Sequence, residues 1–244
     1  MSALIEMDKV SFSAQNQDIL REVSCVFEEA KTTALAGPPG CGKSSMLKLS
    51  AGLLIPSGGA VRFRGKDIVK MNRAENLAFR RETAVVFQDS ALWANQDISQ
   101  ILELPLRLHF PRMAPAERKK RIAEVLEVVG YRKKLSIRPS NLSMGEQKLV
   151  AFARALVCRP VLLYLDEWTE SLDVSGAQRL ISLVKEKKEL HHTVIFVSHD
   201  LRIIRDLADQ IIMMQDGQII LNITREEFES NGELARQVEK GIAS

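Results

Sequence analysis

The chain has 244 residues, of which 45% are hydrophobic and 27% charged, and its formal net charge is +3. These values are typical of a globular protein, either one large α/β domain or a core with a subdomain, that buries a substantial core. Because only 5% of the residues are aromatic and no basic–aromatic interleaving is visible, the sequence argues against a nucleic-acid partner.

The sequence also predicts a protein without a membrane span or a secretory signal. Apolar stretches stay below the roughly 18 residues of a transmembrane helix, and the N-terminus MSALIEMDK lacks a basic segment followed by an apolar one. The three cysteines lack metal-ligand spacing, so we expect reduced thiols in a cytosolic protein, with Cys25 and Cys158 in the core. Basic clusters at 118–121 and 132–134 predict solvated helix surface, and contact with anionic lipid headgroups is the alternative.

The chain begins with strand patterns. Residues 3–12 and 22–28 alternate apolar and polar side chains, which predicts antiparallel strands of an edge sheet. Residues 32–36 form a short apolar run that ends at Gly37, as a buried strand would. The helix that follows is expected to bury Met46, Leu47, Leu49, Leu53 and Leu54.

Residues 37–44 read GPPGCGKS and match the phosphate-binding pattern G-x-x-x-x-G-K-[ST]. Glycines let consecutive backbone N–H groups curl around a phosphate, and the next helix directs its positive N-terminal end at the same anion. Lys43 would reach the outer phosphates of a nucleoside triphosphate, and the Ser44 hydroxyl would hold Mg²⁺. The alternative is a glycine-rich turn that opens an ordinary helix. The expected nucleotide-binding residues are Gly37, Pro38, Pro39, Gly40, Cys41, Gly42, Lys43, Ser44 and Ser45.

Further strand and helix signals follow this loop. Residues from about 91 to 141 lack buried-strand runs, and the apolar positions of 122–129 share one helical face, which predicts an inserted helical subdomain. Residues 210–220 predict a hairpin, and Thr224 with Glu227 a capping box for a C-terminal helical tail. Other strands are expected at 60–63, 84–87, 161–165 and 194–197, and a helix at 175–190.

The motif VLLYLDE, residues 161–167, places two carboxylates at the end of a predicted buried strand, where ligands bind in open α/β sheets. Asp166 is expected to anchor Mg²⁺, and Glu167 to accept a proton from an attacking water. An acidic pair that merely starts a helix is the alternative. His199 follows the next strand and would hydrogen-bond the γ-phosphate, although a lone histidine is more often structural.

The segment LSMGEQKLVAFARAL, residues 142–156, resembles the signature segment of ATP-binding-cassette (ABC) ATPases. The other motifs stand in the order of that family, and the resemblance covers nearly the whole chain. It implies the α/β fold of the P-loop NTPases in its ABC form, with a mostly parallel core sheet, an antiparallel β edge and an inserted helical subdomain. The implied single domain, 1–244, has its core and edge at 1–90 and 157–222, the helical subdomain at about 91–156 and a short helical tail at 223–244.

The resemblance further implies an ATPase in which two such domains pair head to tail around two ATP molecules with Mg²⁺. The second subunit is expected to be a second copy. Separate transmembrane permease subunits would provide the only membrane contact, at the cytoplasmic face of the inner membrane. Glu167 would be the general base, His199 the γ-phosphate switch, and Gln88 a contact to Mg²⁺ and water. The implied Mg²⁺ ligands are Ser44, Gln88 and Asp166, and the residues that contact the opposite copy are Ser143, Met144, Gly145, Glu146 and Asp173.

Five residues depart from the family pattern. Ala14 stands at the position of the aromatic side chain that stacks on adenine, and an alanine cannot stack. Met144 replaces a glycine of the signature, and Trp168 replaces the proline after Glu167. Because the phosphate-loop and acidic residues are retained, we expect an active but slow ATPase. The remaining departures are Glu170 and Ser171.

After Gln88, the segment DSALWANQDISQILELPLRLH resembles that of ATPases from MCE-type (Mla-like) lipid transporters. This resemblance implies transport of lipids or phospholipids, although lipoprotein-release and polar-solute importer ATPases share parts of the pattern. Two other classes stay open. One is a soluble ABC ATPase in a cytosolic assembly of the iron–sulfur scaffold type, and the other is a weakly hydrolysing module that uses ATP as an assembly switch.

Overall fold

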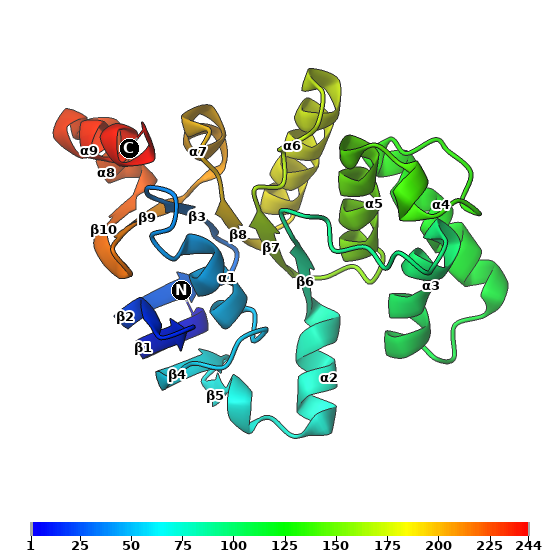
Figure 1. Ribbon diagram of the computed structural model, residues 1–244, viewed down its shortest axis with the longest axis horizontal. Coiled ribbons are helices and arrows are strands. Elements are labelled where there is room, and N and C mark those ends of the chain that lie inside the picture. Colours follow the sequence, from blue (N-terminus) through cyan, green and yellow to red (C-terminus); the bar gives the residue numbers. More distant parts are fainter. Residues whose placement is uncertain (1, 244) are drawn as a thin grey trace.

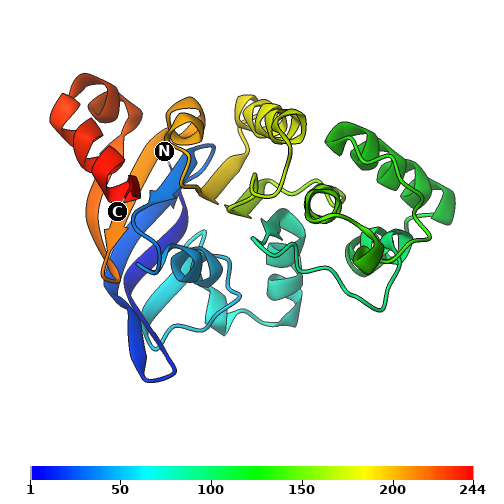
Figure 2. The same cartoon turned by 45° about the horizontal axis from the view of Figure 1, so that its top comes forward.

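The computed structural model describes residues 2–243 and consists of two unequal lobes (Figure 1). The larger lobe contains two sheets with helices around them. The smaller lobe is a group of helices from the middle of the chain, drawn in green. It stands at the far side of the molecule from both termini in Figure 1 and in Figure 2.

A six-stranded sheet forms the centre of the larger lobe. In order across the sheet, its strands are β10 (Gln218–Thr224), β9 (Gln210–Gln215), β3 (Thr32–Ala36), β8 (Thr193–Val197), β7 (Leu162–Asp166) and β6 (Thr83–Val86). All neighbouring pairs are parallel except β9 with β10. Strands β3, β7 and β8 are buried along their whole length because helices or the second sheet cover both faces. The predicted mostly parallel core sheet is confirmed.

The second sheet is antiparallel and forms the predicted edge. Its order is β2 (Gln17–Glu28), β1 (Ala3–Ala14), β4 (Gly58–Phe63) and β5 (Lys66–Asp67). β1 and β2 are longer than the sequence pattern indicated. Gln15 and Asn16 both adopt left-handed backbone, with φ of 50° and 61°, and so close a tight hairpin that keeps the strands paired up to it.

Helix α1 (Lys43–Ser50) packs between the two sheets. Its Met46, Leu47 and Leu49 side chains are fully buried in a hydrophobic cluster to which both sheets contribute. The prediction that Leu53 and Leu54 continue this buried face is wrong. Gly52 adopts left-handed backbone with φ 62° and follows the end of the helix, so Leu53 is 41% exposed and Leu54 half-buried.

The remaining helices of the larger lobe cover the core sheet and its edges. Helix α2 (Arg73–Glu82) was not predicted, because its charged sequence buries fully only Phe79 and relies on an Asn72–Glu75 capping box. The predicted capping box of Thr224 and Glu227 is confirmed at the start of the tail. The others are α6 (Val174–Glu189), α7 (Leu201–Leu207), α8 (Arg225–Ser230) and α9 (Gly232–Ala243).

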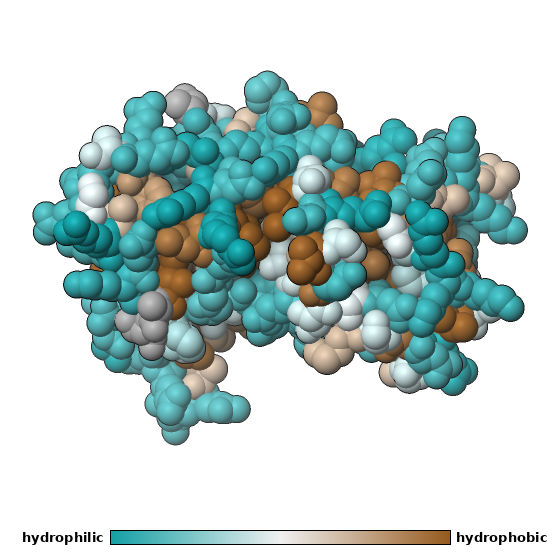
Figure 3. Space-filling model, turned by 90° about the horizontal axis from the view of Figure 1, so that it is seen from above, coloured by the Kyte–Doolittle hydropathy of each residue, from teal (hydrophilic) through white to brown (hydrophobic). Residues whose placement is uncertain are grey.

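The smaller lobe contains α3 (Ile98–His109), α4 (Pro115–Val129), a 3-10 turn at Pro139–Asn141 and α5 (Met144–Leu156). The apolar side chains of the predicted helical face are buried as expected: Ile122, Val125, Leu126 and Val129. Within residues 2–243, no helix combines the length and the apolar character needed to cross a bilayer. Hydrophilic side chains cover most of the face shown in Figure 3, and hydrophobic ones gather mainly near its middle.

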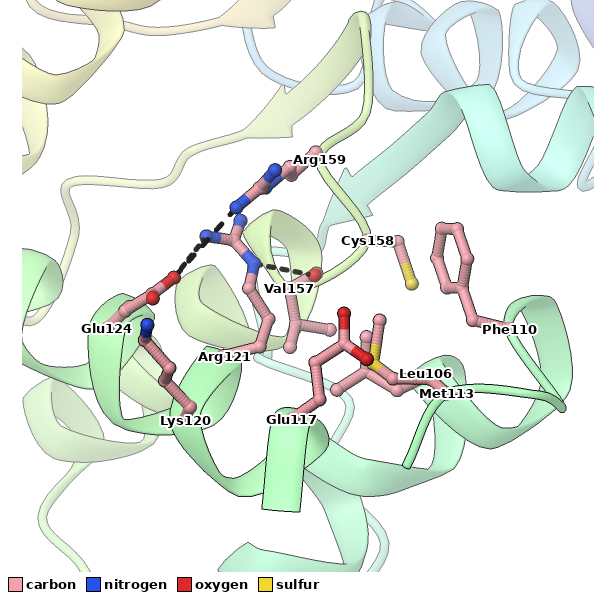
Figure 4. A pocket seen from close by; sticks show the side chains of 10 residues that line it. All are labelled: Leu106, Phe110, Met113, Glu117, Lys120, Arg121, Glu124, Val157, Cys158 and Arg159. Carbon is pink, nitrogen blue, oxygen red and sulfur yellow. Dashed lines mark hydrogen bonds and ion pairs between the residues drawn. The ribbon is translucent and has the colours of Figure 1, made fainter. Parts of the chain in front are cut away.

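The basic cluster at 118–121 is only partly the solvated surface that the sequence predicted. Lys119 and Lys120 are exposed, but Arg118 and Arg121 are 14% and 18% exposed and bond to protein atoms. Arg121 donates to the carbonyl oxygens of Leu156 and Val157 at 2.9 and 3.0 Å. The cavity beside it, about 270 Å³, lies between α3, α4 and the chain after α5 (Figure 4).

The cysteine predictions are half confirmed. Cys25 is buried in the core, and burial raises the pKa of its thiol to about 12. Cys158 is half-buried, packs against the edge of the core and lines the cavity of Figure 4, so its prediction is confirmed only in part.

Replacing Arg121 by alanine should lower the free energy of unfolding by about 1–3 kcal/mol, because the carbonyl oxygens of Leu156 and Val157 lose the guanidinium as a donor, and that of Leu156 keeps the Arg159 amide. Chemical denaturation measures the change. The exposed neighbour Lys120→Ala is the matched control and should stay within about 0.5 kcal/mol of the wild type. Equal effects of the two variants would contradict the role given to Arg121.

Candidate functional site

The phosphate loop connects the buried strand β3 to helix α1. A Cβ at Gly37 would lie 2.2 Å from the carbonyl oxygen of Met214, and one at Gly42 would lie 2.7 Å from Leu20 Cδ2. Both glycines also have positive φ, 136° and 104°, so other residues would be strained there. Gly42 is the N-cap of α1 and has no side chain to cap it, which leaves the first helical amides facing the loop.

Lys43 closes the phosphate loop in this structure. Its Nζ donates to the carbonyl oxygens of Gly37 and Pro38, both at 2.8 Å, and the side chain is buried. These bonds hold the ammonium group inside the loop. A phosphate anion in the loop could replace the two neutral carbonyls with a stronger, charge-assisted partner.

Ser44 and Asp166 come together as the sequence predicted. The Ser44 hydroxyl donates to Asp166 Oδ1 at 2.9 Å, and this bond joins the start of α1 to the end of β7. Burial raises the pKa of Asp166, while the Ser44 hydroxyl opposes this shift. Gln88 lines the same cleft, which has a volume of about 660 Å³.

The donor set of this cleft fits Mg²⁺. A hydroxyl, a carboxylate and an amide oxygen are hard ligands, and Mg²⁺ is bound in proteins by one or two carboxylates together with substrate phosphates. Within residues 2–243, no cluster of three or more His, Cys, Asp and Glu side chains is arranged for a metal. Ser44, Gln88 and Asp166 would therefore hold the ion only together with ATP, whose phosphates it would neutralise.

Glu167 has the properties of a general base. Its side chain is 8% exposed, and burial together with the carboxylates of Glu170 and Asp166 raises its pKa to about 7. A base with such a pKa accepts a proton readily at neutral pH. Glu167 also has a φ of 42°, a left-handed conformation that is strained for a side chain of this size and is typical of functional sites.

His199 lies beside Glu167, with 3.0 Å between His199 Nε2 and Glu167 Oε1. Burial and the nearby Lys43 ammonium lower the pKa of His199, which favours the neutral imidazole. The two side chains are therefore in contact, although Glu167 Oε1 accepts no hydrogen bond within the described residues. The structure thus groups His199 with the predicted base, and the expected contact of His199 with the γ-phosphate stays a prediction.

The signature residues form the start of α5. Ser143 is its N-cap, and its hydroxyl and the Glu146 carboxylate bond each other's backbone amides. A Cβ at Gly145 would lie 2.8 Å from the carbonyl oxygen of Ser171, so the glycine permits close packing there. Met144 is 71% exposed and lines the cleft that holds Gln88 and Asp166. The action of these residues on a second copy stays a prediction.

Two other predicted positions have local roles. Asp173 is the N-cap of α6 and accepts from the backbone amide of Gly176 at 2.9 Å, which lowers its pKa. Its expected contact with an opposite copy stays a prediction. Ala14 ends β1 beside the hairpin turn and is half-buried.

Sequence reasoning missed Lys148 as part of the site. Its side chain is 1% exposed and its Nζ donates to the carbonyl oxygens of Phe87 and Gln88. Its position on the otherwise apolar buried face of α5 was the available signal.

The sequence identified Glu170 only as a departure from the family pattern. In the structure, its carboxylate accepts a hydrogen bond from Gln88 Nε2 at 2.9 Å. Trp168 is buried, with its ring 5.9 Å from that of Phe152.

Comparison with known proteins agrees with this geometry. A family model described as "ABC transporter" matches residues 20–170, which include the phosphate loop, the signature segment, Asp166 and Glu167. The chain belongs to the ABC transporter family. As an ABC ATPase it binds and hydrolyses ATP, which confirms the predicted fold and enzyme class.

Three proteins of known name or structure are similar to this chain. The nickel import ATP-binding protein NikE of Shigella flexneri serotype 5b (strain 8401) is 38% identical over 209 residues, 84% of this chain and 78% of that protein. The ATP-binding cassette MJ0796, solved as a dimer with ADP and Pi in a post-hydrolysis state, aligns with a TM-score of 0.83 at 27% identity, over 91% of this chain and 98% of that one. CbiO1 from Clostridium perfringens, part of the transporter complex cbiONQ, aligns with a TM-score of 0.76 at 27% identity, over 98% and 96%.

These names do not support the lipid transport expected from the segment after Gln88. They describe an importer of nickel and a subunit of another transporter complex. The apolar residues of that segment have a structural use instead, because Ile98, Ile101, Leu102 and Leu106 of α3 are buried in the smaller lobe.

Glu167→Gln should lower the ATP turnover of the purified chain by about 10²- to 10⁴-fold, the usual contribution of a general base. Phosphate release at saturating ATP and Mg²⁺ measures this. Nucleotide affinity should be retained, since the amide has the shape of the carboxylate. A variant with wild-type turnover would show that another group is the base.

The raised pKa of Glu167 has a consequence for stability. The folded state keeps the proton of Glu167 up to a pH of about 7, whereas the unfolded state loses it above the ordinary pKa of 4.5. The contribution of Glu167 to the free energy of unfolding is therefore fully present below pH 4.5 and is lost as the pH rises through 7. The free energy of unfolding of Glu167→Gln minus that of the nucleotide-free wild type should therefore be larger at pH 8 than at pH 5.5, by on the order of 2 kcal/mol. Urea denaturation at both pH values measures the difference, and a difference independent of pH would contradict the raised pKa.

Proposed function

We propose that the chain is the ATP-hydrolysing subunit of an importer, and that two copies work with separate membrane permease subunits. The observation that carries the proposal is the assembled site, in which Lys43, Ser44, Asp166, Glu167 and His199 come from three parallel strand ends. The geometry supports hydrolysis of ATP rather than binding alone, because a buried base with a pKa of about 7 lies beside the metal ligand. This argues against the weakly hydrolysing switch.

The pairing of two copies has support from both the site and the relatives. The exposed Ser143 and Met144 stand at the N-terminal end of the signature helix, where a second nucleotide site could approach. The cassette MJ0796 forms a dimer in its solved structures. In such a pair, Ser143, Met144, Gly145 and Glu146 would complete the γ-phosphate site of the other copy, and Asp173 would contact it. Closure would then depend on ATP.

For the transported solute, we propose a metal ion or a small metal-containing solute. The support is the name of the nickel import relatives, since the ATP site of this chain carries no feature that would recognise a transported solute. Selection would rest with the permease subunits. The ATPase would lie at the cytoplasmic face of the membrane and contact it through these partners.

Isolation of the native complex from solubilised membranes tests the proposal. The tagged chain should co-purify with a multi-span permease and with a second copy of itself, and the subunits can be identified by mass spectrometry. Cells that lack the chain should accumulate less of the metal, with Glu167→Gln as the matched inactive variant. Recovery with soluble scaffold proteins alone would overturn the importer and favour the cytosolic assembly.

A further inference from the structure

Gln88 is held at two points by residues from different parts of the fold. Its backbone carbonyl accepts from Lys148 of α5, and its side-chain Nε2 donates to Glu170 in the turn after β7. Gln88 and Glu170 line the cleft that also contains Ser44 and Asp166. The glutamine therefore connects the signature helix to the catalytic turn at the expected metal position.

Lys148 fixes the backbone of this segment. Only 1% of the residue is exposed, and its ammonium group donates to the carbonyl oxygens of both Phe87 and Gln88. A buried ammonium group needs such partners, because leaving its donors unsatisfied would be costly. The chain beyond Gln88 is held in a similar way, since Arg154 donates to the carbonyl oxygens of Ser90 and Ala91. Four of the five carbonyl groups of residues 87–91 thus accept hydrogen bonds from α5.

Glu170 fixes the side chain of Gln88. A carboxylate only accepts hydrogen bonds, so the atom of Gln88 that faces it must be the amide nitrogen. This leaves the amide oxygen Oε1 as the atom that can ligate a cation. An alanine at position 170 would remove this acceptor, and the cation itself would then have to orient the amide.

We propose that Lys148 and Glu170 are positioning residues that clamp Gln88 at its backbone and its side chain, so that Oε1 is presented to the Mg²⁺ of bound ATP. The inference rests on the proposed role of Gln88 as a contact to Mg²⁺. It predicts that Glu170 acts on the metal only through Gln88, as the partners of metal ligands do in other sites.

The test compares binding of a non-hydrolysable ATP analogue to the full chain in Mg²⁺ and in EDTA. Glu170→Ala should weaken binding about threefold to tenfold in Mg²⁺, as expected from loss of one charge-assisted hydrogen bond, and should leave binding in EDTA unchanged. Glu170→Gln is the matched control. Its amide oxygen still accepts from Gln88, so binding in Mg²⁺ should stay within about twofold of the wild type.

A double-mutant cycle with Gln88→Ala shows whether Glu170 acts through the glutamine. Once Gln88 is removed, Glu170→Ala should have no further effect in Mg²⁺. An undiminished effect in that background would overturn the clamp, as would tighter binding of Glu170→Ala or equal effects of Glu170→Ala and Glu170→Gln. Lys148→Met, which keeps the length of the side chain and removes its donors, should weaken binding in Mg²⁺ and leave binding in EDTA unchanged, and wild-type binding in Mg²⁺ would overturn the backbone half of the clamp.

The outcomes separate this inference from the function on which it rests. If Gln88→Ala leaves the Mg²⁺ dependence of binding unchanged, Gln88 does not contact the metal, and both its proposed role and the clamp fail. If Gln88→Ala weakens binding in Mg²⁺ while Glu170→Ala does not, Gln88 keeps its role and only the clamp fails.

Discussion

The hydrogen bond between Ser44 and Asp166 joins the two halves of the nucleotide site, and the other functional groups are arranged around it. It can form because β3, β8 and β7 are parallel neighbours, so that their carboxyl ends lie at the same edge of the sheet. The phosphate loop follows β3, Asp166 ends β7 with Glu167 directly after it, and His199 follows β8. An antiparallel strand at any of these places would carry its functional group to the opposite edge.

Charge crowding at this edge explains several features together. Asp166 and Glu170 lie close enough to Glu167 to raise its pKa. The buried Lys43 and Lys148 lie near these three carboxylates. Desolvation opposes the charged forms of Asp166, Glu167 and Lys148, so the nucleotide-free site is not arranged for stability. The same arrangement suits a reaction in which Mg²⁺ and phosphates enter together, since the carboxylates then gain a cation and the lysines gain anions.

The elements that the sequence predicted well are those with a strong local signal. Strands β3, β7 and β8 are continuous apolar runs, and the octet from Gly37 needs its glycines because Met214 and Leu20 approach so closely. Predictions failed where a long polar side chain or a single turn residue decided the structure. Arg121 is largely covered through its contacts with carbonyl oxygens, and a left-handed glycine after α1 separates Leu53 from the buried face.

By itself, the sequence determined the fold family and the phosphate-binding motif and predicted the roles of Asp166 and Glu167, because each depends on residues adjacent in the chain. The tertiary structure decided how distant residues combine. Lys148 and Glu170 reach Gln88 from separate elements, 60 and 82 positions away, and His199 meets Glu167 across neighbouring strands. No local spacing encodes such contacts, since they arise only when the sheet and the signature helix pack together.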